Sequence, residues 1–506
     1  MMAELPVDNI ILVGAALLII GILVVGFSER LRVPAALLAL GVGMVAGSDG
    51  LGLVDLADTA MVRDLSVLAL VVILFEGGLT TKPSALREAG PPGLLLSSVG
   101  VLVTALLTGV GVELVFSLGW RTSLLLGAVV SSTDAAVVFD LVRRAPLPRR
   151  LASILEVESG ANDPFAIVLT VALIATFEPG GTADISDWIL FGAWQLVGGL
   201  LVGIAIGFIS RWILNLRLRS EGLYPLVAAG LAGLSYGIAT TVEASGFLAV
   251  YVCGLVIGAT VPRRRRSIRS FHSSLSNGAN LALFLLLGLL VFPSDLVDVA
   301  LPALVVTATL VLVARPVAVL LSLVPFRLGW GERLVLSWTG LRGAVPIVLA
   351  TFPATAGVEG GQVIFNVVFF VVLTSTLLQG TTIVPLVRRV GLEAPGPAWQ
   401  SVAEALPLDV PEIDLAELVV SPDLAIAHTS LADHPPRAGV LVIAILRGGE
   451  AILPTGSTVI LPGDILVLSL DESLVSLTDV TAWARGEVKS DPPETPEIPA
   501  EEDLDD

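Results

Sequence analysis

The sequence predicts a polytopic all-α membrane protein with thirteen transmembrane helices, followed by a small α+β cytoplasmic domain. Its composition is the first indication, because 55% of the 506 residues are hydrophobic and only 15% are charged. A soluble chain carries about 25% charged residues. The second indication is a series of apolar segments long enough to cross a bilayer. The third is the uneven distribution of the formal net charge of −18. Residues 393–506 hold 22 acidic and 4 basic side chains, whereas the first 392 residues hold 24 of each.

Thirteen apolar segments are centred near residues 18, 40, 70, 105, 131, 164, 201, 231, 253, 281, 310, 343 and 375. Lysine and arginine are enriched in the cytoplasmic loops of membrane proteins. Here every odd-numbered loop carries at least two basic residues, and no even-numbered loop carries more than one. This alternation predicts an external N-terminus and a cytoplasmic C-terminus, and one missed helix would invert it. The expected location is a bacterial inner membrane.

Seven charged residues fall within these segments, where a charge costs roughly 2.5–3.5 kcal/mol at the bilayer centre. They must therefore face the protein interior or a water-filled cavity, and they must pair or titrate. The alternative is that they form helix-packing ion pairs or lie at segment boundaries. They are Glu76, Asp134, Glu156, Glu158, Asp163, Arg315 and Arg342.

The richest cluster is LEVESGANDPF in the sixth segment. On a helix Ser159 and Asp163 share one face, and Glu158 and Asn162 share the neighbouring face. Pro164 removes a backbone donor and is expected to loosen the helix. A carboxylate with a hydroxyl one turn away supplies oxygen ligands for a small cation. In a low-dielectric wall this carboxylate favours its protonated form when no cation is bound, so one site can exchange a proton for a cation.

Two segments look interrupted. The polar run from Ser131 to Asp134 lies in the middle of the fifth segment, where an unwound helix would expose backbone carbonyls and the Thr133 hydroxyl to an ion. In the twelfth segment Arg342 lies among helix-disturbing residues, namely Gly340, Gly343 and Pro346. One interruption in each half of the body is typical of a transporter site at the bilayer midplane. The alternative is chance polarity.

Two further charges lie outside these clusters in the sequence. Arg315 lies in an otherwise apolar segment and needs a partner, for which Glu158 is the first candidate. Glu76, in LFEGGL, either lines the site or lies at the membrane interface.

Several classes of function are disfavoured. The single cysteine, Cys253, excludes an intrachain disulfide and a thiolate metal cluster. The three histidines do not form a metal-binding pattern, and the acidic charge balance disfavours nucleic-acid binding. The sequence therefore predicts no cofactor.

At these residues the sequence resembles the monovalent cation:proton antiporter-1 family, the sodium/proton exchanger type. The matching stretches are FEGGL at Phe75–Leu79, STDAA at Ser132–Ala136, ESGAND at Glu158–Asp163, the Arg315–Pro316 span and GLRGA at Gly340–Ala344. The resemblance implies thirteen helices with inverted repeats, two unwound crossing helices and a homodimer. Ala135 departs from the family pattern, since many relatives have proline there.

The resemblance also implies roles for individual residues. Asp163 would carry the cation or proton, with Thr133 and Ser159 as ligands, and Glu158 and Arg315 would form a structural ion pair around Asn162. In this family an Asn-Asp pair, here Asn162 and Asp163, accompanies electroneutral one-for-one exchange. Asp134 and Glu76 complete the candidate cation- and proton-binding set.

The predicted membrane domain covers residues 1–390 and is followed by a linker at 391–412. Residues 413–480 read as strands and resemble a TrkA-C domain, the C-terminal half of a potassium-conductance regulator. The resemblance implies dimerisation, a link to potassium and a possible nucleotide or cyclic dinucleotide regulator; a passive assembly module is the alternative. Residues 481–506 are rich in proline and acid, which predicts a disordered tail.

The leading interpretation is a secondary antiporter that exchanges K⁺, or else Na⁺, for H⁺. A gated cation channel is the first alternative, but the sequence has no TVGYG-type filter. An intramembrane aspartyl protease using Asp134 and Asp163 is the second. That chemistry gives no role to Arg315 and Arg342.

Overall fold

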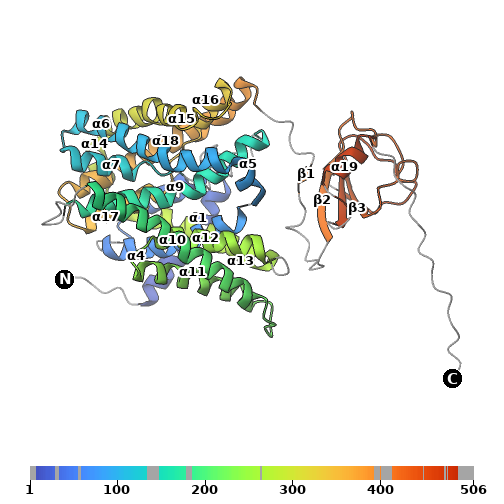
Figure 1. Ribbon diagram of the computed structural model, residues 1–506, viewed down its shortest axis with the longest axis horizontal. Helices are drawn as coiled ribbons and strands as arrows, with labels where there is room; N and C mark the ends of the chain where they lie inside the picture. The colour runs from blue at the N-terminus through green and yellow to red at the C-terminus, as the bar shows by residue number, and fades with distance from the viewer. Residues whose placement is uncertain are drawn as a thin grey trace. The chain divides into compact units, whose positions relative to one another are not determined.

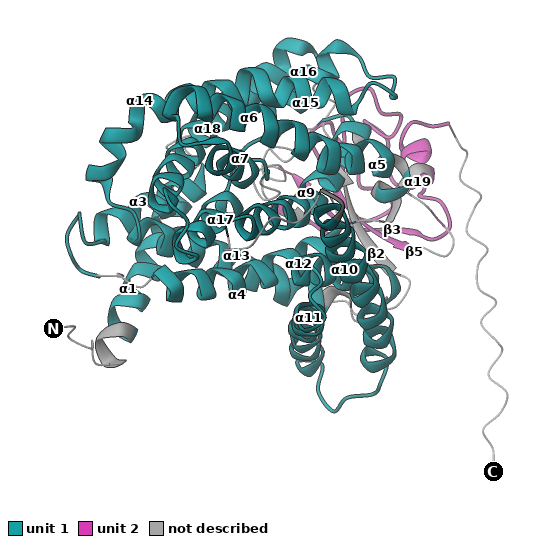
Figure 2. Cartoon of the chain, turned by 60° about the vertical axis from the view of Figure 1, so that its left-hand side comes forward, with its two compact units in different colours: residues 1–394 teal, residues 395–506 magenta. Residues whose placement is uncertain are grey.

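The computed structural model describes residues 7–28, 34–54, 59–81, 83–133, 147–177, 185–261, 265–392, 399–400, 413–447, 450–471, 475 and 477–487. The chain divides into two compact units, residues 1–394 and 395–506 (Figure 2).

The first unit is helical throughout its described parts. Its elements are α1 (Val7–Gly26), α3 (Ala35–Ala46), α4 (Thr59–Thr80), α5 (Pro83–Leu95), the π-helical stretch η1 (Leu96–Gly100), α6 (Val101–Phe116), α7 (Trp120–Val129), α9 (Arg149–Ala175), α10 (Ile185–Leu214), α11 (Leu223–Thr241), α12 (Gly246–Thr260), α13 (Arg265–Leu289), α14 (Pro293–Thr309), the π-helical stretch η2 (Leu310–Ala314), α15 (Arg315–Ser322), α16 (Trp330–Trp338), α17 (Ala344–Thr355) and α18 (Gly361–Val390).

These helices sort into two packed groups. In the first group α12 packs against α4, α10 and α11, while α13 packs against α3 and α4. In the second group α7 packs against α6 and α9, and α18 packs against α14 and α17. Contacts of α17 with α4 and of α9 with α10 join the groups. Figure 1 shows α9 and α17 near the middle of this unit, with α14 and α18 on one side and α4 and α11 on the other.

Glycine allows the closest helix contacts. A Cβ added to Gly43 of α3 would lie 2.9 Å from the Cα of Gly288 on α13. No side chain fits between the two backbones at that point, so the helices approach through their main chains. Close approach through small residues is the usual packing mode of membrane helices, which gain little from burying apolar surface against one another.

Six helical segments are long and apolar enough to cross a membrane: 89–116, 150–175, 187–214, 223–241, 293–322 and 361–390. Four shorter apolar helices are Ile11–Gly26, Ala35–Ala46, Gly246–Thr260 and Ala344–Thr355. The chain is therefore a multi-pass helical membrane protein. Its large side chains confirm this environment, because many leucines and isoleucines of α1, α10 and α14 point outward.

The second unit is built on a five-stranded antiparallel sheet in the order β1-β2-β5-β3-β4. Its elements are β1 (Trp399–Gln400), β2 (Ile413–Val419), β3 (Val440–Arg447), β4 (Glu450–Ile452), β5 (Ile465–Asp471) and α19 (Leu477–Ala484). Strands β3 and β4 pair antiparallel, and residues 448–449 between them lie outside the described residues.

Helix α19 closes the core of this unit. Trp483 is 1% exposed, and its indole Nε1 donates a hydrogen bond of 2.8 Å to the carbonyl of Pro435. The predicted boundary at residue 480 thus falls inside α19, because Trp483 belongs to the apolar core. Of the predicted linker, 393–398 and 401–412 lie outside the described residues, as does the predicted tail after residue 487.

A buried carboxylate fixes the turn before β5. The backbone N–H of Leu461 donates to Asp464 over 2.8 Å, and Arg447 donates to it from Nε and Nη2 over 2.8 and 2.7 Å. The Asp464 side chain is only 2% exposed, whereas that of Arg447 is 37% exposed. The hydrogen bonds from Arg447 hold the pKa of the Asp464 carboxyl below its usual value, and the Leu461 N–H acts in the same direction against burial.

We predict that Asp464→Asn destabilises the second unit at pH 7 by about 1–3 kcal/mol, the range for a lost hydrogen-bonded charge. Because folding lowers the pKa of Asp464, the carboxylate stabilises the unit above its unfolded-state pKa of about 4. This stabilisation disappears as the pH falls through the folded-state pKa. Hydrogen exchange of β5 in the full-length protein measures the effect, with the exposed Glu487→Gln as control. Equal β5 exchange in Asp464→Asn and wild type at pH 7 would contradict the prediction.

Candidate functional site

Helix α9 carries four of the predicted site residues on its buried side. Glu158, Ser159 and Asn162 are each 1% exposed, and Asp163 is 5% exposed. The helix runs without interruption through Pro164, so the expected local loosening is not observed. Proline still removes one N–H from the helical ladder. The cluster therefore lies on a continuous helix wall.

The backbone after α7 brings polar side chains to this wall. Helix α7 ends at Val129, and Ser131, Ser132 and Thr133 follow in a turn and non-helical backbone, all buried. The Ser132 hydroxyl donates a hydrogen bond to Oδ1 of Asp163. The Nδ2 group of Asn162 donates to Oγ1 of Thr133.

These contacts unite Thr133, Asn162 and Asp163, as the sequence suggests, and they add Ser132. Oδ1 of Asn162 has no hydrogen-bond partner among the described residues, so this oxygen is available to a ligand. Ser159 lies one turn before Asp163 on α9. Asp134 lies outside the described residues. Hydroxyl, amide and carboxylate oxygens thus gather around Asp163, and oxygen ligands suit hard cations.

The charge of Glu158 is balanced by the partner that the sequence favours. Oε1 of Glu158 lies 2.6 Å from Nη1 of Arg315, with side-chain exposures of 2% and 4%. Nη2 of Arg315 donates to the carbonyl of Leu336 over 3.2 Å. A Cβ on Gly340 would lie 2.6 Å from Nε of Arg315, so the absence of a side chain there makes room for the guanidinium. The pair connects α9 to α15, and Arg315 also packs over Gly340 in the segment between α16 and α17.

That segment is the second interruption. Helix α16 ends at Trp338 and α17 begins at Ala344, with a turn and non-helical backbone between them. Arg342 lies here and is 1% exposed. Its Nη1 donates to the carbonyls of Ser131 and Ser132, each over 2.7 Å. We expected these carbonyls to be exposed to an ion, but they are occupied by Arg342.

Glu76 lies away from these contacts. It is a half-buried residue of α4, and Arg269 of α13 is its electrostatic neighbour. Among the described residues no hydrogen bond joins it to α9. Arg269 donates instead to the carbonyl of Leu79, over 3.0 Å from Nε and 2.7 Å from Nη2. The structure therefore places Glu76 on the facing helix group.

Tyr251 is a residue that sequence reasoning missed. It lies on α12, and its hydroxyl is 3.3 Å from Oγ1 of Thr81, just beyond α4. The same hydroxyl packs over Gly160 of α9, leaving no room for a Cβ at residue 160. The aromatic ring thus packs tightly against α9, one turn before Asp163. A tyrosine in an apolar segment carries no signal that separates this position from ordinary packing.

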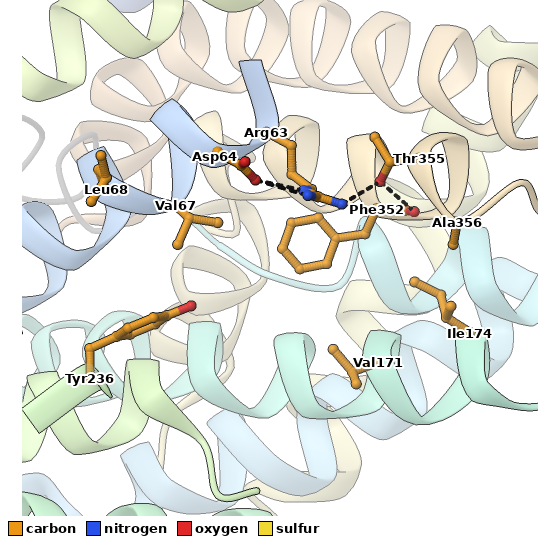
Figure 3. Close-up of a pocket in the computed structure, with 10 residues that line it drawn as sticks. All are labelled: Arg63, Asp64, Val67, Leu68, Val171, Ile174, Tyr236, Phe352, Thr355 and Ala356. Carbon is orange, nitrogen blue, oxygen red and sulfur yellow. Dashed lines mark hydrogen bonds and ion pairs between the residues drawn. The ribbon is translucent and has the colours of Figure 1, made fainter. Parts of the chain in front are cut away.

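A cavity of about 640 Å³ lies farther along α9 (Figure 3). Val171 and Ile174 line it from α9, beginning about 12 Å beyond Asp163 at the helical rise. Arg63 spans its rim: Nη2 lies 2.9 Å from Oδ1 of Asp64, and Nη1 donates to Oγ1 of Thr355 over 3.2 Å. The remaining lining residues are Val67, Leu68, Tyr236, Phe352 and Ala356.

This cavity lies between the two helix groups. The lining of α4 and α11 faces that of α9 and α17. Relative to Asp163, it lies toward the C-terminal end of α9, whereas Tyr251 and Gly160 lie toward the N-terminal end.

A buried carboxylate beside two interrupted helices of a multi-pass bundle is typical of secondary transporters. Residues 14–389 match the family model described as sodium/hydrogen exchanger, transmembrane, and residues 415–477 match the TrkA-C domain. The chain belongs to the sodium/hydrogen exchanger family and carries a TrkA-C domain.

The chain is 37% identical over 502 residues to the K(+)/H(+) antiporter NhaP2 of Shewanella sp. (strain ANA-3), covering 97% of this chain and 85% of that protein. It is 36% identical over 482 residues to the K(+)/H(+) antiporter NhaP of Alkalimonas amylolytica, covering 94% and 83%. Among solved structures it resembles the sodium proton antiporter MjNhaP1 from Methanocaldococcus jannaschii at pH 8. That match has a TM-score of 0.63 and 26% identity, and it covers 76% of this chain and 96% of that one.

We predict that Glu158→Ala and Arg315→Ala each lower the free energy of unfolding by about 3–5 kcal/mol, because each leaves a buried charge without its partner. The double variant should lose less than the sum of the two. Thermal unfolding in detergent measures this double-mutant cycle. Additive losses would show that the two residues do not stabilise one another, and Arg342 would then be tested against Glu158.

Proposed function

We propose that the protein exchanges a monovalent cation for a proton at Asp163, one for one. The observation that carries this proposal is the buried Asp163 carboxylate, which accepts a hydrogen bond from Ser132 and follows Asn162, whose Oδ1 has no hydrogen-bond partner within the described part of the chain. A proton and a cation compete for this carboxylate. Because Asn162 is neutral, each occupant leaves the pair with the same charge, and the exchange moves no net charge.

The substrate that we favour is K⁺, with Na⁺ as the second possibility. Two relatives at 36–37% identity are named K(+)/H(+) antiporters, and the TrkA-C domain supports the same choice. The solved neighbour is named a sodium proton antiporter. The ligand set around Asp163 consists of oxygens, which both ions accept.

We propose alternating access by movement of the two helix groups against each other. The cavity beside Arg63 lies between the groups on one side of Asp163, and Tyr251 packs against Gly160 on the other. This arrangement suits a state in which Asp163 is approached from the cavity side and closed on the Tyr251 side. Glu76 then lines the route on the facing group, and Asp134 and Ser159 complete the oxygen ligands.

The membrane architecture that accompanies this mechanism has thirteen spans in inverted repeats, with the interruptions at 131–133 and 339–343 as the crossing unwound helices. The protein would be a homodimer in a bacterial inner membrane, with the N-terminus outside and the C-terminal domain in the cytoplasm. We assign transport to residues 1–390 and regulation to the domain that begins at residue 413 and ends with α19, with 391–412 as a linker and an acidic tail after α19. A nucleotide or cyclic dinucleotide is the proposed class of regulator.

We predict that Asp163→Asn abolishes cation-induced proton movement, because an amide cannot titrate. The exposed Asp295 of α14 supplies a matched control, since Asp295→Asn removes a carboxylate outside the cluster. Both variants and the wild type are reconstituted in vesicles that carry a pH gradient, and K⁺ or Na⁺ is then added. The control should dissipate the gradient at the wild-type rate. Substantial exchange by Asp163→Asn would rule out this mechanism, and current without proton coupling would favour a channel.

We predict that a protein ending at Val390 still exchanges at saturating cation concentration, because the described cluster lies before that residue. Its dependence on pH, cation or added nucleotide should change, since a regulatory domain biases the transport states through contacts that differ between them. Vesicles containing each length are compared over a pH series. Loss of exchange at every pH in a folded truncated protein would make the C-terminal unit part of the transport machinery. Superimposed profiles would reduce it to an assembly module.

A further inference from the structure

Arg342 makes contacts that are not explained by cation–proton exchange at Asp163 alone. The guanidinium is 1% exposed, and its Nη1 donates to two backbone carbonyls. Its Nε and Nη2 have no hydrogen-bond partner among the described residues. Burying unpaired donors and a charge costs free energy. The hydrogen bonds from Nη1 to the segment after α7 therefore need a functional reason that offsets this cost.

The two carbonyls need a cationic or hydrogen-bonding partner. Helix α7 ends at Val129, so the carbonyls of Ser131 and Ser132 have left the regular helical ladder, and they carry the partial negative charge of a helix C-terminus. Such carbonyls could bind a transported cation, as in other discontinuous helices. Arg342 is already hydrogen-bonded to both.

Two side chains of the same segment, those of Ser132 and Thr133, contact α9. Ser132 donates its hydroxyl hydrogen to Asp163, and Thr133 accepts from Asn162. Arg342 thus holds the backbone of a segment whose side chains contact the two α9 residues at the centre of the site.

Helix α18 holds Arg342 in turn. The Thr376 hydroxyl donates to the carbonyl of Arg342 over 2.6 Å, and Nε2 of Gln379 donates to the carbonyl of Trp338 over 3.0 Å. Both ends of the second interruption are therefore anchored to α18. The position of the guanidinium is set by the fold before any cation enters.

We propose that Arg342 is a positioning residue that determines which oxygens bind the transported cation. By occupying the carbonyls of Ser131 and Ser132, it keeps these two main-chain oxygens from binding the cation. By fixing that backbone, it keeps the Ser132 and Thr133 hydroxyls directed at α9. The inference rests on the proposed function and specifies the ligand set of the same site.

The test compares Arg342→Met with Arg342→Lys in vesicles. We expect Arg342→Met to raise the cation KM at least about tenfold with a smaller change in kcat, the signature of lost ligand binding. An ammonium can donate to both carbonyls, so Arg342→Lys should restore KM to within about threefold of wild type.

Arg333→Met is a matched control. Arg333 also donates from Nη2 to two backbone carbonyls, those of Leu323 and Phe326, over 3.4 Å each. Its contacts lie at the loop before α16 and outside the cluster, so the variant should lower the melting temperature and leave KM unchanged. A wild-type KM in folded Arg342→Met, or no recovery with Arg342→Lys, overturns the proposal.

Should Arg342→Met fail to fold, Thr376→Val decides the question. It removes the hydroxyl that anchors Arg342 while the guanidinium remains. A KM raised about threefold supports positioning, whereas a lower melting temperature with wild-type KM shows a structural role only and overturns it. Thermal stabilisation by added K⁺, measured on the same variants, reports binding without transport. A wild type that binds K⁺ but does not exchange would refute the proposed function, while the variants' binding would still decide the role of Arg342.

Discussion

Backbone groups that leave a helix within a bilayer have no water to bond with, so the protein must supply their partners. Two interruptions, at 131–133 and 339–343, face this constraint in the membrane unit. In the first, Arg342 from the second pairs the carbonyls of Ser131 and Ser132. At the second, α18 pairs the carbonyl of Arg342 through Thr376 and that of Trp338, where α16 ends, through Gln379. The two interruptions lie side by side because one supplies a donor for the carbonyls of the other. The polar cluster forms where they meet α9.

Charge balance on α9 follows the same logic. Glu158 and Asp163 lie on one helix, but they have different surroundings. Arg315 lies against Glu158 and packs over Gly340, which ties α9 to the second interruption. Asp163 instead accepts a hydrogen bond from a hydroxyl on the first interruption. A carboxylate paired with a guanidinium suits a structural role, and in the proposed mechanism the carboxylate that accepts from a hydroxyl is the one that exchanges its occupant.

Much of this arrangement can be predicted from the residue types alone. Apolar segments and loop charges predicted a multi-pass helical body, the strand-like pattern of residues 413–480 predicted the sheet of the second unit, and the need to pair buried charges predicted Arg315 beside Glu158. The unpredicted contacts involve backbone acceptors or ordinary residues. Every residue has a backbone carbonyl, so the sequence does not single out those of Ser131 and Ser132 as partners of Arg342. Tyr251 has the same sequence pattern as any buried aromatic residue. Pro164 suggested a loosened helix, but the packing around α9 keeps that helix continuous.

The contact between Tyr251 and Gly160 has a consequence for how the chain tolerates mutation. The ring occupies the volume in which any other residue at position 160 would place its Cβ. Every substitution of Gly160 adds at least one carbon at that point, so we expect no missense mutation at this codon to be mild. A smaller residue at 251 would relieve the clash but leave a void in a close-packed wall. The two positions therefore constrain each other, and a change at one becomes acceptable only together with a compensating change at the other.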